Sequence, residues 1–490
     1  MGKYSVPADI RAYKPKGTMV KNIDGRFYVY ECKYSKIWVE DGDGNKKRKS
    51  KTEMGKCIGS ITLKDGFISN ANKLSESEIT CLKYGDYAFA INCSKDTLEL
   101  LKEEFNTADA NQIYTVALIF FVEGFVYMKR VKDYYDYSYL SLAFPDSHVG
   151  YSALESLYKN LGQRSGLVDK FEQNLFEKSS KRVAIDGHVI SCTSEYNDLS
   201  EYGYKASKLG SEQLNWINAY DVVEKRPLLS QMCNGSDPDK TSVKLLFERF
   251  SLTNTEFCVD RGFNTKQDKE LMSENGNTYI VPMITGRKDY TFVYDKIHFT
   301  KKNTFIYDKD GYSSLIYFQV VLYQGVRCIA YKDTTRESYE RKTYINNIKK
   351  GRKGYTEDGL NECEKDFGLF LLETNNGALS PQEIFSHYKD RWSIETFYNY
   401  IKNDLDFNAL YQQTYGGVMG LSFIITITSL IYYDVKNNIA ESGVEIKDLM
   451  HTLRKIKAVK KAKKWKIHNV VKKTREISEL IGFDIPEYAL

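Results

Sequence analysis

The chain has 490 residues, 42% of them hydrophobic and 28% charged, and 70 Lys or Arg against 65 Asp or Glu give a net charge of +5. This balance excludes an intrinsically disordered chain, and the length allows more than one domain around a sizeable core. Nine cysteines without a C-x-x-C pair argue against a zinc module and for reduced thiols in a cytoplasm. No signal peptide is expected, because residues 1–17 contain no apolar run.

Residues 1–93 are expected to form a small β-rich unit that binds DNA. Residues 27–32 (FYVYEC) and 56–63 (KCIGSITL) have the composition of strands. Between them, residues 41–51 (DGDGNKKRKSK) combine a turn signal with a basic cluster that includes Lys47 and Arg48. The cluster is either a solvated hairpin tip or a set of contacts to DNA phosphates.

Residues 94–180 have helical patterns. Ser94 is a suitable N-cap for SKDTLELLKEEF, whose apolar residues recur at helical spacing. An apolar run at residues 111–125 and two segments within 152–179 extend the pattern. We therefore expect a helical region here.

Strands and helices alternate over residues 181–284, which indicates a mixed or parallel sheet covered by helices. The expected strands are residues 182–190 (RVAIDGHVI), 227–232, 256–259 (EFCV) and 279–284. The expected helices are residues 242–250 and 264–275.

A β-rich insertion is expected at residues 285–366, where strand-like runs such as FVYDKIHF, NTFIYDKDG and SSLIYFQVVLYQGVRCIAYKD follow one another. The alternating pattern resumes over 367–440, beginning with the strand FGLFLLE. Ser380, Pro381 and Glu383 then form a strong helix start, with an N-cap, a proline at the first position and a glutamate three residues after the cap.

The last two segments differ sharply in charge. Residues 412–433 hold no charged side chain, and we expect a helix buried in the core rather than a membrane span. Residues 441–490 are expected to be a basic helical region. Within it, residues 454–475 hold eleven Lys or Arg, including Lys461 and Lys464, and no acid. Like charges so close together repel one another. Contact with DNA phosphates would relieve this repulsion, and RNA or a membrane surface is the alternative partner.

Residues 388–402 (YKDRWSIETFYNYIK) continue the helical pattern that begins at Ser380. At 100° per residue, four polar residues share an arc of about 60°: Tyr388, Arg391, Glu395 and Lys402. The opposite side is apolar: Ile394, Phe397 and Ile401. Taken alone, this pattern is that of a solvent-facing stripe with an Arg391–Glu395 ion pair.

Two further carboxylates change that interpretation. Asp186 lies within the apolar strand RVAIDGHVI, and Asp260 directly follows EFCV, at the end of a strand where α/β folds place ligand sites. Three converging acids repel one another unless divalent cations such as Mg²⁺ lie between them. His188 shares a strand face with Asp186 and is either a packed residue or a catalytic one. Arg261 is a possible charge-balancing neighbour.

Asp186 in AIDG, Asp260 in VDRGF and the pattern Y-x2-R-x3-E-x6-K resemble the DDE transposases of bacterial insertion sequences, specifically the insertion sequence four branch. The resemblance covers residues 180–433. It implies an α/β fold with an RNase H-like catalytic core interrupted by a β-rich insertion, with helical flanking regions.

The same resemblance implies a function. Asp186, Asp260 and Glu395 would bind two Mg²⁺ ions, which Mn²⁺ could replace, and cut-and-paste transposition would proceed by nicking, a hairpin and strand transfer. Tyr388, Arg391 and Lys402 would hold the DNA end. The expected partners are the transposon's inverted-repeat ends, target DNA and a second copy of the chain, with no membrane. The expected location is the bacterial cytoplasm, at the nucleoid when DNA is bound.

One feature departs from the family. Its relatives stack a flipped base on a tryptophan of the β-rich insertion, whereas residues 285–365 hold none here. A Tyr or Phe of the insertion could take its place. The chain's tryptophans are Trp38, Trp216, Trp392 and Trp465. Two other functions stay open: an RNase H-like DNA nuclease without strand transfer, and a domesticated DNA-binding protein, which would have no use for three converging acids.

Overall fold

The computed structural model describes residues 6–40, 46–64, 66–69, 79–194, 196–203, 210–309, 311–462 and 464–489, apart from the side chains of residues 33, 37–40, 46–49, 239 and 240. The chain divides into two compact units, Met1–Cys81 and Leu82–Leu490. The division thus lies nearer the N-terminus than the boundary at residue 93 expected from the sequence.

The first unit is a four-stranded antiparallel sheet in the order β1-β2-β3-β4 with one short helix. A turn at Asp24 and Gly25, both at positive φ, joins the first two strands. The small core contains Ile10, Val29 and Ile61. Both strands expected from the sequence are present and are longer than expected. The elements are α1 (Ala8–Ala12), β1 (Thr18–Ile23), β2 (Arg26–Glu40), β3 (Lys46–Thr62) and β4 (Gly66–Ser69).

The second unit begins with a helical layer, as expected, although its first helix starts at Gly85 rather than after Ser94. Asn106 caps the longest helix of the layer by accepting a hydrogen bond from the backbone N–H of Asp109. The helices are α2 (Gly85–Cys93), α3 (Lys95–Glu104), α4 (Thr107–Glu123), α5 (Met128–Asp136), α6 (Leu140–Ala143), α7 (Tyr151–Gln163) and α8 (Ser165–Glu177).

A large mixed sheet follows, and its first half has the order β10-β9-β6-β7-β8. β6, β9 and β10 run parallel, whereas β7 and β8 are antiparallel to their neighbours. The elements are β6 (Arg182–Cys192), β7 (Gln213–Asp221), β8 (Arg226–Cys233), α10 (Asp239–Arg249), β9 (Glu256–Val259), α11 (Lys266–Leu271) and β10 (Thr278–Pro282). The sequence patterns identified every strand except β7, whose polar residues Gln213, Asn215 and Asn218 are fully buried.

The β-rich insertion extends this same sheet with β11, β12 and β13, and β14, the first strand after it, pairs antiparallel with both β13 and β10. The elements are α12 (Lys288–Tyr294), β11 (Thr304–Lys309), β12 (Tyr312–Tyr323), β13 (Val326–Asp333), α13 (Thr334–Lys349), α14 (Glu357–Cys363) and β14 (Leu369–Thr374). The strand expected at FVYDKIHF is wrong. That segment ends α12, because Tyr290, Val293 and Ile297 pack at helical spacing against Val321 of the sheet.

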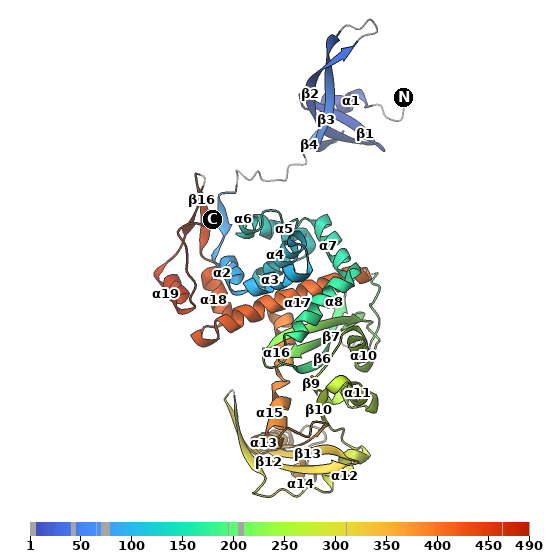
Figure 1. The fold of residues 1–490 in the computed structure, drawn as a ribbon, viewed down its shortest axis with the longest axis vertical. Helices are drawn as coiled ribbons and strands as arrows, with labels where there is room; N and C mark the ends of the chain where they lie inside the picture. The colour runs from blue at the N-terminus through green and yellow to red at the C-terminus, as the bar shows by residue number, and fades with distance from the viewer. Residues whose placement is uncertain are drawn as a thin grey trace. The chain divides into compact units, whose positions relative to one another are not determined.

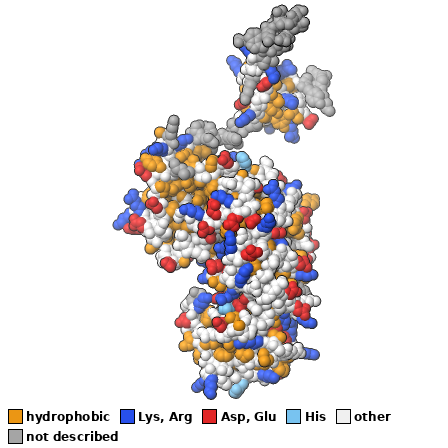
Figure 2. Space-filling model, in the orientation of Figure 1, with side chains coloured by type: hydrophobic (Ala, Val, Ile, Leu, Met, Phe, Trp, Pro, Cys, Tyr) orange, Lys and Arg blue, Asp and Glu red, His pale blue; other side chains and the backbone are white. Residues whose placement is uncertain are grey.

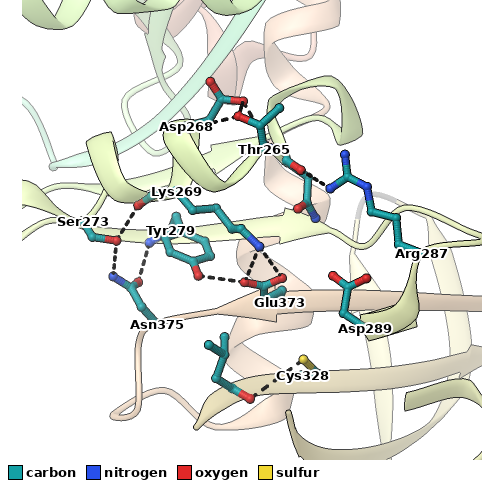
Figure 3. Close-up of polar contacts among 12 residues, drawn as sticks. Thr265, Asp268, Lys269, Ser273, Tyr279, Arg287, Asp289, Cys328, Glu373 and Asn375 are labelled. Atoms are coloured by element: carbon teal, nitrogen blue, oxygen red, sulfur yellow. Dashed lines mark hydrogen bonds and ion pairs between the residues drawn. The ribbon is translucent and has the colours of Figure 1, made fainter. Parts of the chain in front are cut away.

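A buried polar network joins β14, the strand that follows the insertion, to β10 and α11 (Figure 3). The carboxylate of Glu373 in β14 accepts two 2.9 Å hydrogen bonds from Lys269 Nζ in α11 and one of 2.9 Å from Tyr279 Oη in β10. Asn375 accepts a hydrogen bond from the backbone N–H of Tyr279 and donates to Ser273 Oγ. These contacts fix β14 beside β10, and β14 leads on to the helix that carries Glu395.

The uncharged segment forms α17 (Tyr415–Asn438), the central helix of the second unit (Figure 1). It is long and apolar enough to cross a membrane, but 89% of its most apolar window is buried inside the protein, as expected for a core helix. α17 contacts α4, α7 and β8. It approaches α7 so closely that a Cβ on Gly420 would lie 1.9 Å from the carbonyl oxygen of Tyr158. The glycines of this segment therefore serve helix packing.

The basic C-terminal region is not mainly helical, contrary to expectation. Residues 457–468 form a β-hairpin in which Ala458 pairs with Ile467, and Ala462 turns the chain at φ 56°. These two paired apolar residues are buried, whereas Lys460, Lys461 and Lys464 near the turn are exposed. The elements are β5 (Cys81–Lys83), which pairs with β16, then α18 (Ile446–Leu453), β16 (Lys457–Lys461), β17 (Lys464–His468) and α19 (Lys472–Leu480).

Candidate active site

Asp186 and Asp260 lie on neighbouring parallel strands. In the register of β6 and β9, Ile185 pairs with Val259, and the two aspartates are the next residues of their strands. Parallel neighbours in register point their side chains to the same face of a sheet. The two carboxyl groups therefore lie beside each other at the carboxyl end of β9.

Glu395 reaches this face from a helix that packs on β6. Tyr398 of α16 (Ser393–Asn399) donates a 2.7 Å hydrogen bond to the carbonyl oxygen of Asp186. Asn218, opposite Asp186 on β7, donates through Nδ2 to Tyr398 Oη at 3.2 Å. His188 stacks on the Tyr398 ring, with the ring centroids 4.8 Å apart. These contacts position Glu395, one turn before Tyr398, near the aspartates.

The segment that carries Glu395 is not the continuous regular helix assumed from the sequence. α15 (Pro381–Asp390) starts at the expected capping box of Ser380 and Glu383 and stops before Arg391. Tighter i→i−3 hydrogen bonds join it to α16. Residues Tyr400–Asp404 then widen into a π-helix, a departure from regular geometry that is frequent at functional sites.

The charges of the three acids act on one another. Burial is the main cause that raises the pKa of Asp186 from its ordinary 3.8 to about 6, and the charges of Asp260 and Glu395 raise it further. A hydrogen bond from the Gly187 N–H and the charge of Arg391 oppose the rise. A nearby positive charge, such as a bound cation, would stabilise the ionised form of this carboxyl group.

Arg391 is the cation among these acids, and it is buried rather than solvent-facing, with 8% of its surface exposed. Its Nη2 lies 3.4 Å from Glu395 Oε1. Burial favours loss of its proton, but its acidic neighbours, Tyr388 first among them, outweigh that effect and raise the pKa of Arg391. Its buried Nε–H has no hydrogen-bond partner in the described part of the chain. That donor is available to an anion.

The donor set suits a hard divalent cation. Asp186, Asp260 and Glu395 supply carboxylate oxygens, which Mg²⁺ prefers. Burial first, and then the charges of Asp260 and Glu395, raise the pKa of Asp186. In the described residues, no group of three or more His, Cys, Asp or Glu side chains lies close enough to hold one ion together. Mg²⁺ takes one or two protein carboxylates and completes its shell with water and phosphate, so pairs of these acids fit it.

The other residues singled out from the sequence lie at different distances from the acids. Tyr388 is near them: burial raises its pKa, as does the charge of Asp260, and the Arg391 guanidinium lies 5.6 Å from its ring centre. Arg261 follows Asp260 and opposes that rise. Lys402 lies further along the chain, in the π-helical segment, with an exposed side chain.

A cavity of about 860 Å³ is lined by Arg391, the cation among the acids, and sequence patterns did not reveal it. Its walls come from the insertion, from α15 and from the segment after β9. Arg261, Tyr388 and Arg391 line it together with Trp392, whose side chain is 66% exposed. The insertion, β14 and α15 add cations and aromatic rings: Tyr307, Lys309, Tyr312, Arg336, Phe370 and Lys389.

The remaining basic candidates belong to other elements of the chain. The side chains of Lys47 and Arg48 lie outside the described residues, although their backbone belongs to β3. Lys461 and Lys464 are exposed at the turn of the C-terminal hairpin. Figure 2 shows further Lys and Arg side chains over α19, where Lys472, Lys473 and Arg475 are exposed.

Comparison with known proteins places this site within a family. The model of the transposase DDE domain matches residues 177–431, a span that contains Asp186, Asp260 and Glu395. A search of curated proteins finds no match. Among solved structures, a piggyBac transposase in a synaptic complex with hairpin DNA is similar at a TM-score of 0.38 and 10% identity, covering 72% of this chain and 71% of that one.

Proposed function

This chain belongs to the transposase DDE domain family, and from that membership we propose a metal-dependent DNA transposase that cuts transposon ends and joins them to target DNA. The observation that carries the proposal is the placement of Asp186, Asp260 and Glu395 around the buried Arg391 within the matched span. Mg²⁺ or Mn²⁺ bound by pairs of these acids would activate the attacking oxygen and stabilise the leaving oxygen of a phosphodiester.

The chain's own residues prepare the site for a DNA end. Arg391 offers its free Nε–H to a phosphate while its Nη2 holds Glu395 in place. Tyr398, through the Asp186 carbonyl and Asn218, fixes α16 against the sheet and so fixes Glu395. We assign Tyr388 to a phosphate hydrogen bond. Lys402, exposed in the π-helical segment, would contact the strand further out.

Strand order supports an RNase H-like core. Three antiparallel strands, β6, β7 and β8, are followed by β9 and β10, which lie parallel to β6 on its other side, in the order β10-β9-β6-β7-β8. The insertion between β10 and β14 falls where the insertion sequence four branch carries one. The Y-x2-R-x3-E-x6-K spacing supports that branch, and with it bacterial origin, a nucleoid location and a homodimer on paired ends.

The cavity lined by Arg391 and Trp392 supports a hairpin intermediate. A sharply bent DNA end requires an unstacked base, and aromatic rings bind such bases at about 1–3 kcal/mol each. The insertion has no tryptophan, but Trp392 presents its exposed ring from the segment between Arg391 and Glu395. We propose Trp392 for the stacking role that other members give to the insertion.

Product analysis tests the proposal. The 490-residue chain is incubated with Mg²⁺ and with labelled duplexes taken from the DNA that flanks the coding sequence. Nicked, hairpin and joined products are then resolved. Cleavage followed by joining is expected. Nicks without joining would establish the nuclease alternative, and tight binding without any cleavage would establish a DNA-binding protein.

Two tryptophan variants test the hairpin step. Trp392→Ala should still nick the DNA end but form hairpins about tenfold more slowly, because a base that cannot stack makes the bent end less stable. Trp465→Ala, which alters a half-buried tryptophan of the C-terminal hairpin, is the matched control. Equal hairpin rates in both variants would remove the role assigned to Trp392.

A further inference from the structure

The long hairpin of the first unit extends past the sheet to which it belongs (Figure 1). β1 pairs only with residues 26–31 of β2, and β4 pairs only with residues 59–62 of β3. Beyond them, within the described part of the chain, β2 and β3 pair only with each other, over nine residue pairs from Cys32 opposite Met54 to Glu40 opposite Lys46. This outer half is a two-stranded antiparallel ribbon about 30 Å long, at about 3.4 Å per residue.

Neither face of the ribbon is covered where its side chains are described. Side chains alternate between the two faces of a strand, yet all those of residues 34–36 and 50–54 are exposed. Tyr34 is 70% exposed and Met54 46%. An isolated two-stranded hairpin is marginally stable in water. A ribbon of this length with large exposed side chains therefore indicates a partner that covers it.

The charge of the ribbon identifies the chemistry of that partner. Residues 33–40 and 46–54 contain seven Lys or Arg and two Glu, and five of the six residues 46–51 are cationic. A polyanion complements this charge. The major groove of DNA is about 12 Å wide and admits a two-stranded β-ribbon, whereas the minor groove is about 6 Å wide and does not. The ribbon's length is close to one turn of the double helix, about 34 Å.

We propose that this ribbon enters the major groove of double-stranded DNA and reads the transposon end, while the acids of the second unit perform the chemistry. The inference rests on the proposed function for the identity of its substrate. Cations of β3 would contact phosphates and guanine edges. Exposed polar and apolar side chains such as Tyr34 and Thr52, which pair across the ribbon, would contact base edges.

Binding measurements on the full chain test the ribbon. Glu395→Gln serves as the background so that DNA is bound without being cut. The probes are duplexes of the DNA flanking the coding sequence and scrambled duplexes of the same length. Adding Lys47→Gln and Arg48→Gln should lower the preference for the flanking DNA about tenfold or more, because each good base contact contributes that much discrimination.

The matched control removes the same charge from the same unit away from the ribbon. Lys21→Gln with Arg26→Gln alters two exposed cations at the opposite end of the sheet and should leave the preference within about twofold of the background protein. An unchanged preference in the Lys47 and Arg48 variant, or an equal loss in both variants, would overturn the inference.

Methylation interference locates the groove. Methylation at guanine N7, in the major groove, should block binding at a run of positions in the flanking DNA, and the ribbon variant should lose that pattern. Interference confined to adenine N3, in the minor groove, would contradict the proposal. Cleavage by the wild-type chain is measured in parallel. If the wild type cleaves but the ribbon variant keeps its preference, only the role of the ribbon is refuted. If the wild type binds the DNA without cleaving it, the proposed chemistry is refuted.

Discussion

Asp186 carries a carboxyl group whose surroundings oppose its charge. Burial and the neighbouring Asp260 and Glu395 favour the protonated form and outweigh Arg391 and the Gly187 N–H. Such a group lowers the stability of the folded chain once it ionises, unless a cation is bound. Asp186 thus connects the stability of the metal-free protein to the function proposed for it.

Thermal unfolding in EDTA measures this effect. The folded-state pKa of about 6 lies above the ordinary 3.8, so the stability contributed by the bound proton is full below about pH 4 and is lost as the pH rises through 6. Asp186→Asn removes the ionisable group and with it this loss of stability. The variant should therefore be about 1–3 kcal/mol more stable than wild type at pH 7.5 and equally stable near pH 4. Asp295→Asn, an exposed acid, is the control. A variant less stable than wild type at pH 7.5 would contradict this reasoning.

Residue patterns predicted the strand positions of Asp186 and Asp260 better than the surroundings of Arg391. Asp186 was identified because a charge inside an apolar strand needs a partner, and Asp260 because it ends a strand. Arg391 was expected on a solvent-facing stripe and is buried, because a helical wheel shows which residues share a face but not what covers that face. Trp392 was noted only as lying outside the insertion.

The strands and helices that hold the site followed local sequence patterns where burial and pattern agree. β6, β9 and the capping box of α15 were predicted on these grounds. β7 was missed because buried Asn215 and Asn218 interrupt its apolar pattern, and their hydrogen bonds to distant residues are invisible in sequence. The C-terminal hairpin was missed because its many lysines conceal the two buried apolar residues that pair across it, Ala458 and Ile467.

The network around Glu373 is expected to hold β14 against α11 and β10. Glu373→Ala would leave Lys269 and Tyr279 without their acceptor and should destabilise the chain by about 2–4 kcal/mol in urea unfolding. Glu270→Ala breaks the exposed ion pair of Lys266 on the same helix and should change stability by less than about 0.5 kcal/mol. Similar losses in the two variants would show that the network does not anchor β14.

For the whole molecule, we propose that one compact unit recognises the DNA and the other performs the chemistry. The first carries the cationic ribbon, and the second carries the acids, the cavity and the basic hairpin. Sequence patterns separated a β-rich N-terminal unit from the rest but placed its end at residue 93. The turn to helical spacing was noticed only at Ser94, although α2 already begins at Gly85.

Metal-dependent cleavage by single isosteric variants tests the central claim most directly. Asp186→Asn, Asp260→Asn and Glu395→Gln, each verified as folded, are compared with wild type and the Asp295→Asn control on labelled flanking DNA in Mg²⁺ and in Mn²⁺. Each of the three variants should lose cleavage by roughly a thousandfold or more while still binding the DNA, and the control should cleave like wild type. Wild-type cleavage by any of the three would contradict the assignment of these acids.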